Sequence, residues 1–298
     1  MVSRTLRLDR PFDIFKTFIL HRRGPHDATM RVTDRELWRA TRTPDGPAGL
    51  YLGARGEVVE AQAWGQGATW LIDRLDRLVG AGDDHAALVP AHPVVRALER
   101  RMRGMRIGRT DRVLEALIPA IIEQKVTSHE AHRSYRKMVF AWGEPAPGPI
   151  GLRVPPEPAR IAATPYHEFH RFGVERKRAD VLRAVCARAN RLEECSELPR
   201  DAAAARMRIF KGVGVWTAAE VAARAFGDPD AVSLGDFHLP HLVSWALEGK
   251  RRGSDERMLE LLAPYAGQRG RVIRLIEAGI DPPARRVPRQ RVRSIAAI

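Results

Sequence analysis

The chain has 298 residues and a formal net charge of +14 at pH 7, and its length suits two or three domains. Cys186 and Cys195 are its only cysteines, too few for a disulfide framework, a four-cysteine zinc site or the usual iron–sulfur cluster. Its apolar stretches are shorter than the ~18 residues of a membrane span, and no signal peptide is recognisable at the N-terminus, so a cytoplasmic protein is expected. The positive charge favours a polyanionic partner, because Lys and Arg gain by releasing counterions from phosphates.

The first part of the chain predicts a mixed α and β unit. Extended segments are expected at 29–33, 36–43, 49–53 and 57–63, and the turn sequences Pro44–Pro47 and Ala54–Gly56 separate them. Apolar residues between Trp70 and Val79 then recur at helical spacing, which indicates a helix over the sheet. Gly80–Asp84 resembles a joint, so residues 1–85 are assigned to an N-terminal αβ domain.

Beyond this joint the apolar spacing is helical. One stripe runs from Val113 to Ile122, with Thr110 and Asp111 as candidate caps, and another runs from Tyr135 to Trp142. The proline-rich residues 143–158 predict a loop. Further helices are expected near Pro165, Arg176, Ala202, Trp216, Ser254 and Gln268.

These elements divide the rest of the chain into four parts. Residues 86–109 are expected to supply a helix that packs with the C-terminal lobe, and residues 110–230 form a helical lobe. Residues 231–281 form the C-terminal lobe. Residues 282–298 carry five arginines, three prolines and no acidic residue, which predicts a disordered basic tail.

The strongest local signal is the segment 210–218, Phe-Lys-Gly-Val-Gly-Val-Trp-Thr-Ala. An apolar helix precedes it and another follows, so a hairpin of two helices is predicted over 207–226. Gly212 and Gly214 let the backbone turn sharply and leave amide groups uncovered, and such amides beside a helix N-terminus suit a phosphate oxygen. Gly-x-Gly alone is commonly only a turn, but between two helices of a basic chain it indicates a DNA-binding helix-hairpin-helix.

A second signal is the segment 233–237, Ser-Leu-Gly-Asp-Phe, which lies beyond the second helix and the turn Gly227–Asp230. An aspartate in such a segment is most commonly a helix cap. Its position downstream of the hairpin makes Asp236 a candidate for chemistry as well.

Together these residues resemble the helix-hairpin-helix DNA glycosylase superfamily, and most closely its 3-methyladenine (alkylpurine) branch, glycosylase II. That branch has a hairpin reading Pro-Gly-hydrophobic-Gly-x-Trp-Thr-Ala and then a catalytic Asp, and Gly212–Ala218 and Asp236 fit both parts. Its upstream Gln-x-Val-Ser-like element, which reaches the DNA at the lesion, is matched by Gln124–Thr127, and its late Pro-aromatic element by Pro264–Tyr265. The resemblance covers about residues 90–275 and, more loosely, the N-terminal domain.

The resemblance implies an α+β fold, with an N-terminal antiparallel αβ domain and a two-lobed all-α helix-hairpin-helix glycosylase core. Asp236 would be the catalytic carboxylate, and Trp216, Glu220 and Phe237 would line the base pocket. A monovalent cation, Na⁺ or K⁺, would bridge backbone carbonyls of the 210–215 hairpin and a phosphate, and no further metal or cofactor is expected. The residues that would bind DNA come from the lesion-side element and the hairpin: Gln124, Lys125, Thr127, Lys211, Gly212, Val213, Gly214, Val215 and Thr217.

Three positions set this chain apart from its relatives. Lys211 replaces the usual Pro. Lys125 aligns with the intercalating side chain, which is commonly apolar, although the stem of a lysine can also fill a gap; the neighbouring Val126 is the alternative plug. The lyase branch has a nucleophilic Lys where this chain has Trp216, so the Schiff-base route lacks its nucleophile.

The sequence therefore predicts a monomeric, nucleoid-associated, monofunctional glycosylase of base excision repair. It would flip alkylated bases such as 3-methyladenine out of double-stranded DNA and hydrolyse their N-glycosidic bonds, without lyase activity. Two alternatives stay open: a non-catalytic helix-hairpin-helix DNA-binding protein, and an 8-oxoguanine-type glycosylase/lyase.

Overall fold

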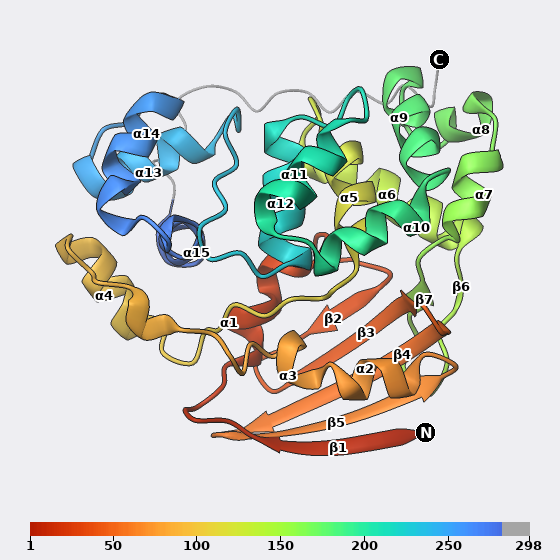
Figure 1. The fold of residues 1–298 in the computed structure, drawn as a ribbon, viewed down its shortest axis with the longest axis horizontal. Helices are drawn as coiled ribbons and strands as arrows, with labels where there is room; N and C mark the ends of the chain where they lie inside the picture. Colours follow the sequence, from red (N-terminus) through yellow and green to blue (C-terminus); the bar gives the residue numbers. More distant parts are fainter. Residues whose placement is uncertain (282–298) are drawn as a thin grey trace.

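The computed structural model describes residues 1–281 (Figure 1). Its N-terminal part is a five-stranded antiparallel sheet in the order β1-β5-β4-β3-β2. The strands are β1 (Val2–Arg7), β2 (Met30–Val32), β3 (Glu36–Thr43), β4 (Gly46–Arg55) and β5 (Val58–Gly65). The predicted extended segments match β2 to β5, whereas the edge strand β1 was not predicted.

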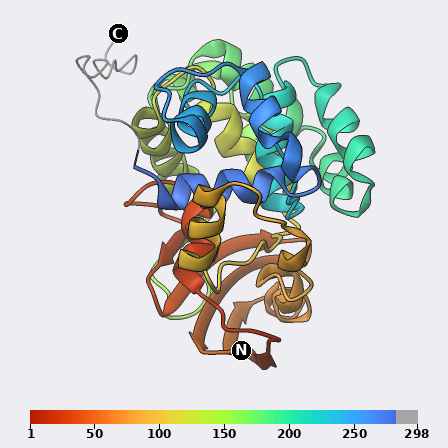
Figure 2. The same cartoon turned by 90° about the vertical axis from the view of Figure 1, so that its left-hand side faces the viewer.

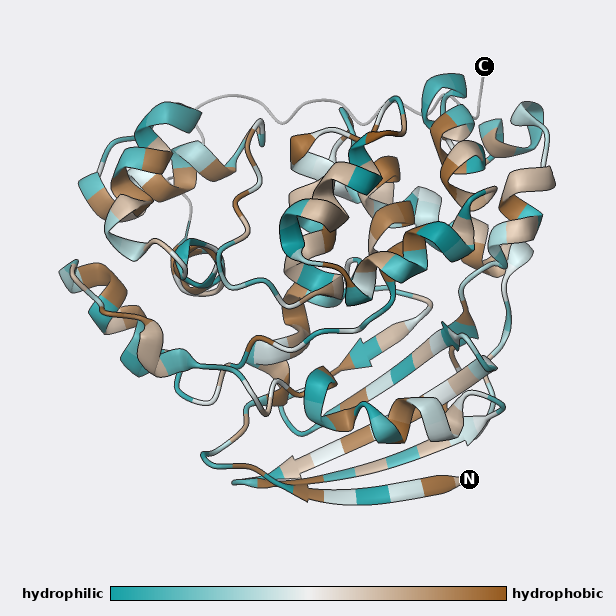
Figure 3. Ribbon diagram, in the orientation of Figure 1, coloured by the Kyte–Doolittle hydropathy of each residue, from teal (hydrophilic) through white to brown (hydrophobic). Residues whose placement is uncertain are grey.

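One face of this sheet is covered by short helices: α1 (Ile14–Phe18), η1 (Ile19–His21), α2 (Ala68–Asp73) and α3 (Leu75–Leu78). Alternate strand residues turn inward, as the alternating colours along the strands show (Figure 3). Leu37, Leu50 and Val59 pack with Ile14 and Phe18 in a core belonging to this unit. The single helix predicted from Trp70 to Val79 is in fact two helices that meet at Arg74.

Helices form most of the remainder. They are η2 (His85–Ala87), α4 (Pro93–Arg101), α5 (Val113–Glu123), α6 (Ser128–Trp142), α7 (Pro158–Ala163), α8 (Tyr166–His170), α9 (Arg176–Cys186), α10 (Ala189–Glu193), η3 (Glu194–Glu197), α11 (Arg200–Arg208), α12 (Val215–Ala225), α13 (Leu239–Glu248), α14 (Asp255–Leu262), η4 (Ala263–Tyr265) and α15 (Arg269–Gly279). The segment predicted as a loop at 143–158 contains a small hairpin, β6 (Glu144–Pro145) with β7 (Arg153–Val154).

The helical part has two main hydrophobic cores. One gathers apolar side chains of α5, α6, α9 and α12. The other joins α4 to α13, α14 and α15, although α4 comes far earlier in the chain. Figure 2 shows the helical part stacked on the sheet, with α4 and α15 meeting at the junction. The α+β fold class, an antiparallel sheet followed by a helical core, is confirmed.

The start of α5 corrects one prediction. Thr110 and Asp111 do not cap it: Asp111 lies in the left-handed region (φ 53°) and accepts from the guanidinium of Arg77 at 3.1 Å. The carboxylate of Glu193, far along the chain, accepts instead from the amides of Val113 and Leu114, at 2.9 and 3.0 Å. The residue that caps α5 is therefore Glu193, which is distant in the sequence and reaches α5 only in the folded protein.

Within residues 1–281, no helix is long and apolar enough to cross a bilayer. Cys186 and Cys195 are both buried as free thiols. The basic segment 282–298, predicted to be disordered, lies outside the described residues.

Candidate functional site

The hairpin lies between α11 and α12. After α11 the chain turns through residues 209–214, and Gly214 is the N-cap residue of α12. The Val213 side chain is buried and its amide donates to the Phe210 carbonyl at 2.9 Å. That amide is therefore engaged within the turn, and the predicted contact of Val213 with phosphate stays a prediction. Lys211, Gly212, Gly214 and Val215 are exposed.

The two hairpin glycines have different physical roles. Gly212 lies in the left-handed region (φ 100°), and a Cβ added there would meet Val181 Cγ2 at 2.4 Å. Gly214 has an ordinary φ of −93°, and a Cβ added there would meet no atom within 4 Å. Gly212 is thus required by the turn itself, whereas Gly214 leaves open space in front of the N-terminus of α12.

The turn between α5 and α6 lies against this hairpin. Gln124, the residue after α5, donates from Nε2 to the Gly212 carbonyl and to Thr217 Oγ1, both at 2.9 Å. The Ile122 carbonyl at the end of α5 accepts from the buried guanidinium of Arg178 at 2.6 Å. The two elements that the resemblance assigns to DNA binding are therefore joined by direct hydrogen bonds.

Lys125 occupies the tip of this turn. Its φ is 57°, in the left-handed region that side chains other than glycine rarely adopt, and the residue is exposed. Thr127 then begins α6 in a capping box: its Oγ1 accepts from the Glu130 amide, and its own amide donates to the Glu130 carboxylate. Gln124 and Thr127 are thus fixed by hydrogen bonds, and the side chain of Lys125 is exposed between them.

Asp236 lies directly beside the hairpin helix. Its Oδ2 accepts from the indole Nε1 of Trp216 at 3.0 Å. Its Oδ1 accepts from the amides of His238 and Leu239, at 2.7 and 2.9 Å, at the start of α13. The carboxylate therefore does cap a helix, the common role of such a residue, and it is also held against α12 by one of the residues predicted to line the base pocket.

The segment carrying Asp236 is pinned on both sides. Ser233 donates from Oγ to Glu220 Oε1 at 2.6 Å, and the Gly235 amide donates to the Asp255 carboxylate at 2.7 Å. Gly235 itself has a left-handed φ of 83°. Because Trp216 and Glu220 are four residues apart on α12, they share one face of that helix, and the segment 233–236 runs along it.

The predicted base-pocket residues do not all point the same way. Trp216 is half-buried against Asp236, and the second carboxylate oxygen of Glu220 accepts from Arg224 at 2.5 Å. The Phe237 side chain, by contrast, is 78% exposed and lies edge-on to His238 and His241. Phe237 is therefore not packed with Trp216 in this structure.

Helix α15 adds two residues that the sequence analysis did not identify. Arg274 donates to the Ala223 carbonyl of α12. One turn later, Glu277 lies in the electrostatic reach of Glu220, Arg224 and Asp236. Loss of surrounding water and the nearby Glu220 carboxylate raise the pKa of Glu277 to about 7. No local motif marks these positions, and only the packing of α15 on α12 reveals them.

No group of three or more His, Cys, Asp or Glu side chains that could hold a metal ion occurs within the described part of the chain. The monovalent cation expected at the backbone carbonyls of residues 210–215 would need no such group, and it stays a prediction.

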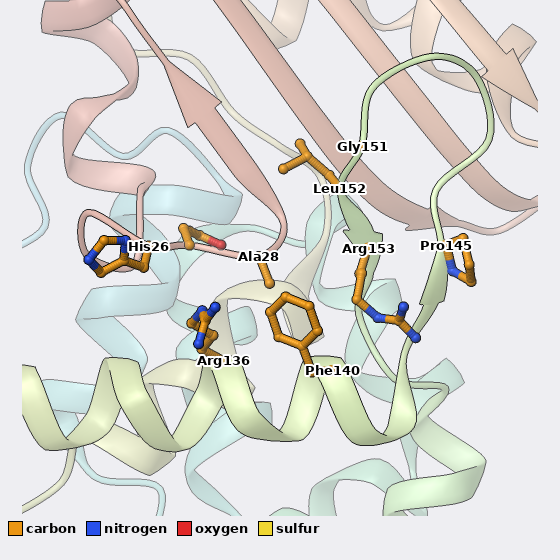
Figure 4. Close-up of a pocket in the computed structure, with 9 residues that line it drawn as sticks. His26, Ala28, Arg136, Phe140, Pro145, Gly151, Leu152 and Arg153 are labelled. Atoms are coloured by element: carbon orange, nitrogen blue, oxygen red, sulfur yellow. The ribbon is translucent and has the colours of Figure 1, made fainter.

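A separate pocket of about 440 Å³ lies between the loop after η1, α6 and β7 (Figure 4). The ring of Phe140 stands between the guanidiniums of Arg136 and Arg153. Arg153 donates to the Val139 and Gly143 carbonyls, and Asp27 accepts from the amides of Arg23 and Thr29. These bonds join β7 to the end of α6 and shape the loop before β2. At 1.5 Å per helical residue, Phe140 is roughly 20 Å along α6 from the Lys125 turn.

Comparison with known proteins places this geometry in context. No protein-family model matches the chain. Over 171 residues, 56% of this chain, it is 29% identical to a probable bifunctional transcriptional activator/DNA repair enzyme AlkA from Mycobacterium tuberculosis (strain H37Rv). That alignment covers 34% of the relative, so the chain spans about a third of the length of the curated proteins that it matches.

Two solved structures agree with the chain over almost its whole length. A 3-methyladenine DNA glycosylase from Archaeoglobus fulgidus superimposes with a TM-score of 0.74 at 19% identity, covering 92% of this chain and 97% of that one. An 8-oxoguanine glycosylase/lyase from Clostridium acetobutylicum, in complex with double-stranded DNA, has a TM-score of 0.69 at 13% identity, covering 92% and 96%. The chain therefore has the fold of the helix-hairpin-helix DNA glycosylases, and its sequence resembles the alkylpurine branch of that superfamily.

Proposed function

We propose that this protein is a monofunctional DNA glycosylase of base excision repair, which hydrolyses the N-glycosidic bond of alkylated bases flipped out of double-stranded DNA. The observation that carries the proposal is the hydrogen bond from Trp216 of the hairpin helix to Asp236. It brings the candidate DNA clamp and the candidate catalytic carboxylate together, although they are separated in the chain.

The DNA backbone would be held at the hairpin. The amides of Gly214 and Val215 open the N-terminus of α12, where the helix dipole and uncovered N–H groups favour a phosphate. The open space in front of Gly214 allows a phosphate to approach the backbone closely. A monovalent cation at the carbonyls of residues 210–215 would reinforce the same contact, and the basic charge of the chain would add non-specific affinity.

The chemistry would belong to Asp236. A stacked base hides its glycosidic bond, so the nucleotide must first leave the helix. Three N–H donors hold the Asp236 carboxylate in one orientation, so that it could stabilise positive charge developing at C1′, orient the attacking water, or do both. An N-alkylated purine already carries positive charge and is a good leaving group, so no strong general acid is required.

Strand cleavage is not part of the proposal. A lyase needs an amine nucleophile, and at the position where the lyase branch has lysine this chain has Trp216, whose indole N–H is bonded to Asp236. The fold likeness to an 8-oxoguanine glycosylase/lyase does not supply that amine.

The decisive experiment is mass spectrometry of the bases released from double-stranded DNA carrying alkylated, deaminated and oxidised bases. We expect alkylated purines to be released, no nick before alkali treatment, and no covalent adduct on borohydride reduction. DNA binding without base release would favour the non-catalytic alternative, and a trapped adduct with release of 8-oxoguanine would favour the lyase.

A further inference from the structure

The candidate base pocket is bordered by charged groups from three segments. On α12, Glu220 accepts from Ser233 at 2.6 Å and from Arg224 at 2.5 Å, so its carboxylate is held in place. Asp236 lies on the same side of the helix through its bond with Trp216. The carboxylates of Glu220 and Asp236 therefore both lie where α12 meets the segment before α13.

Helix α15 packs against α12 and the segment that follows it, beginning with the first turn of α15. The Arg269 amide donates to Asp230 at 3.0 Å, and the Arg271 amide to the Pro229 carbonyl at 2.8 Å. Arg274 then donates to the Ala223 carbonyl of α12. Glu277 follows Arg274 by three residues, which places it on the same side of α15, facing Glu220 and Arg224.

Glu277 differs from Glu220 in its surroundings. The side chain of Glu277 still reaches solvent, but protein on several sides removes part of the water around its carboxyl, whereas the carboxylate of Glu220 is held by two partners. The charged groups around Glu277 are Glu220 and Arg224 from α12, Arg274 from α15 and Asp236 from the segment before α13. An exposed carboxyl beside the proposed reaction centre is positioned to contact a base that enters from solvent.

We propose that Glu277 is a specificity-determining residue that, with Glu220, favours positively charged N-alkylated purines over neutral damaged bases. The inference rests on the proposed glycosylase function. A bound base would displace water from between itself and the carboxylate, so a cationic base would be attracted more strongly than in open solvent, whereas a neutral base gains much less. The stacking of an electron-poor base on Trp216 would act in the same direction.

The charge of Glu277 should also respond to pH. Its pKa is raised to about 7, so the group is largely protonated below that pH and ionised above it. Preference for cationic bases should therefore grow as the pH rises through neutrality. This dependence separates an electrostatic role from a merely structural one.

The test compares single-turnover excision of a cationic base, 3-methyladenine, which has no N1 proton to lose near neutral pH, with that of a neutral base, hypoxanthine, in otherwise identical duplexes. For the wild type we expect the ratio of the two rates to rise about tenfold between about pH 6 and about pH 8. In Glu277→Gln the ratio should be lower and independent of pH, whereas Glu277→Asp should restore the pH dependence. Glu60→Gln, on the exposed side of β5, is the matched control and should behave as the wild type.

Each outcome has a separate meaning. If Glu277→Gln leaves the ratio of rates and its pH profile unchanged, the role of Glu277 is refuted while the glycosylase function stands. If the wild type releases neither base at any pH, the proposed function itself fails. Melting curves of Glu277→Gln and of the wild type verify that the variant is folded under the conditions of the assay.

Discussion

The two turns that meet at Gln124 achieve similar backbone bends by different means. In the hairpin turn the left-handed residue is Gly212, which adopts φ 100° without strain. In the turn between α5 and α6 it is Lys125, which carries a full side chain at φ 57°. A non-glycine residue there costs on the order of 1 kcal/mol, and the surrounding contacts of Gln124, Arg178 and Thr127 hold the turn in place.

The choice of glycine in one turn and lysine in the other indicates which atoms each turn exposes to a binding partner. The hairpin exposes backbone at Gly212 and Gly214, which have no side chain to cover it. The Lys125 turn exposes a side chain, and glycine would defeat that purpose. Strain that is maintained by neighbouring contacts is typical of functional sites. If both turns grip DNA and Asp236 carries out the chemistry, substitutions at the three places should have separable effects.

The largest effect is expected at Asp236. Asp236→Asn keeps the size of the side chain but removes its charge, so base release should fall ~100-fold or more, while binding to abasic-site DNA stays close to wild type. Single-turnover kinetics and binding titrations measure the two quantities. Turnover within about threefold of wild type would remove Asp236 from the catalytic role.

Gly214→Val tests the backbone-presenting turn. A side chain at Gly214 meets open space within the protein, so the variant should fold, but it should obstruct the phosphate and weaken DNA binding about tenfold or more, whatever base is present.

Gly212→Ala is the contrasting control for that turn, because its Cβ would meet Val181 and its φ is left-handed. It should lower the melting temperature. Undiminished affinity of a folded Gly214→Val protein would mean that the hairpin is only structural, and wild-type affinity that does not fall with added salt would contradict phosphate binding.

Lys125→Ala tests the side-chain-presenting turn. If Lys125 fills the gap left by the flipped nucleotide, excision from duplex DNA should fall about tenfold more than excision of an already unpaired base, because unstacking costs a few kcal/mol only in the duplex.

Equal losses on both substrates would identify Lys125 as a general phosphate contact, and no loss on either would exclude it as the plug and point to Val126. Lys125→Gly relieves the left-handed strain, so it should lower excision without lowering stability.

The smallest effect on activity is expected beneath this turn, at Glu123. Its carboxylate lies 2.9 Å from Arg23 and 3.5 Å from His132. Burial opposes ionisation, but Arg23, His132 and Arg224 together outweigh it, and the pKa of Glu123 falls from 4.5 to about 2. A lowered folded-state pKa contributes stability above the unfolded value, and this is lost as the pH falls toward 2. Glu123→Gln should therefore be about 1–3 kcal/mol less stable than wild type at neutral pH.

That difference should vanish near the folded pKa of Glu123, which denaturant titrations across the acid range would reveal. A difference that persists unchanged to low pH would show that the ion pair with Arg23 is not its source.

Several features of this protein could be predicted from local sequence alone. The hairpin around Gly212 and Gly214 is recognisable because a sharp turn between two apolar helices needs glycine at fixed positions. Strands β2 to β5 follow from alternating residues and turn sequences. The resemblance that links Gln124, Trp216 and Asp236 marked segments that the structure joins by hydrogen bonds, and their roles in DNA binding and catalysis stay predictions.

Other features depend on contacts between distant segments. The cap of α5 comes from Glu193, the orientation of Phe237 away from Trp216 depends on the start of α13, and Glu277 reaches the site only because α15 docks on α12. Local patterns report backbone conformation and amphipathic faces, since these depend on near neighbours. Which charged side chain of one helix lies beside which of another, and how its pKa responds, is decided by tertiary packing, because Coulomb interactions and the loss of water depend on separation in space.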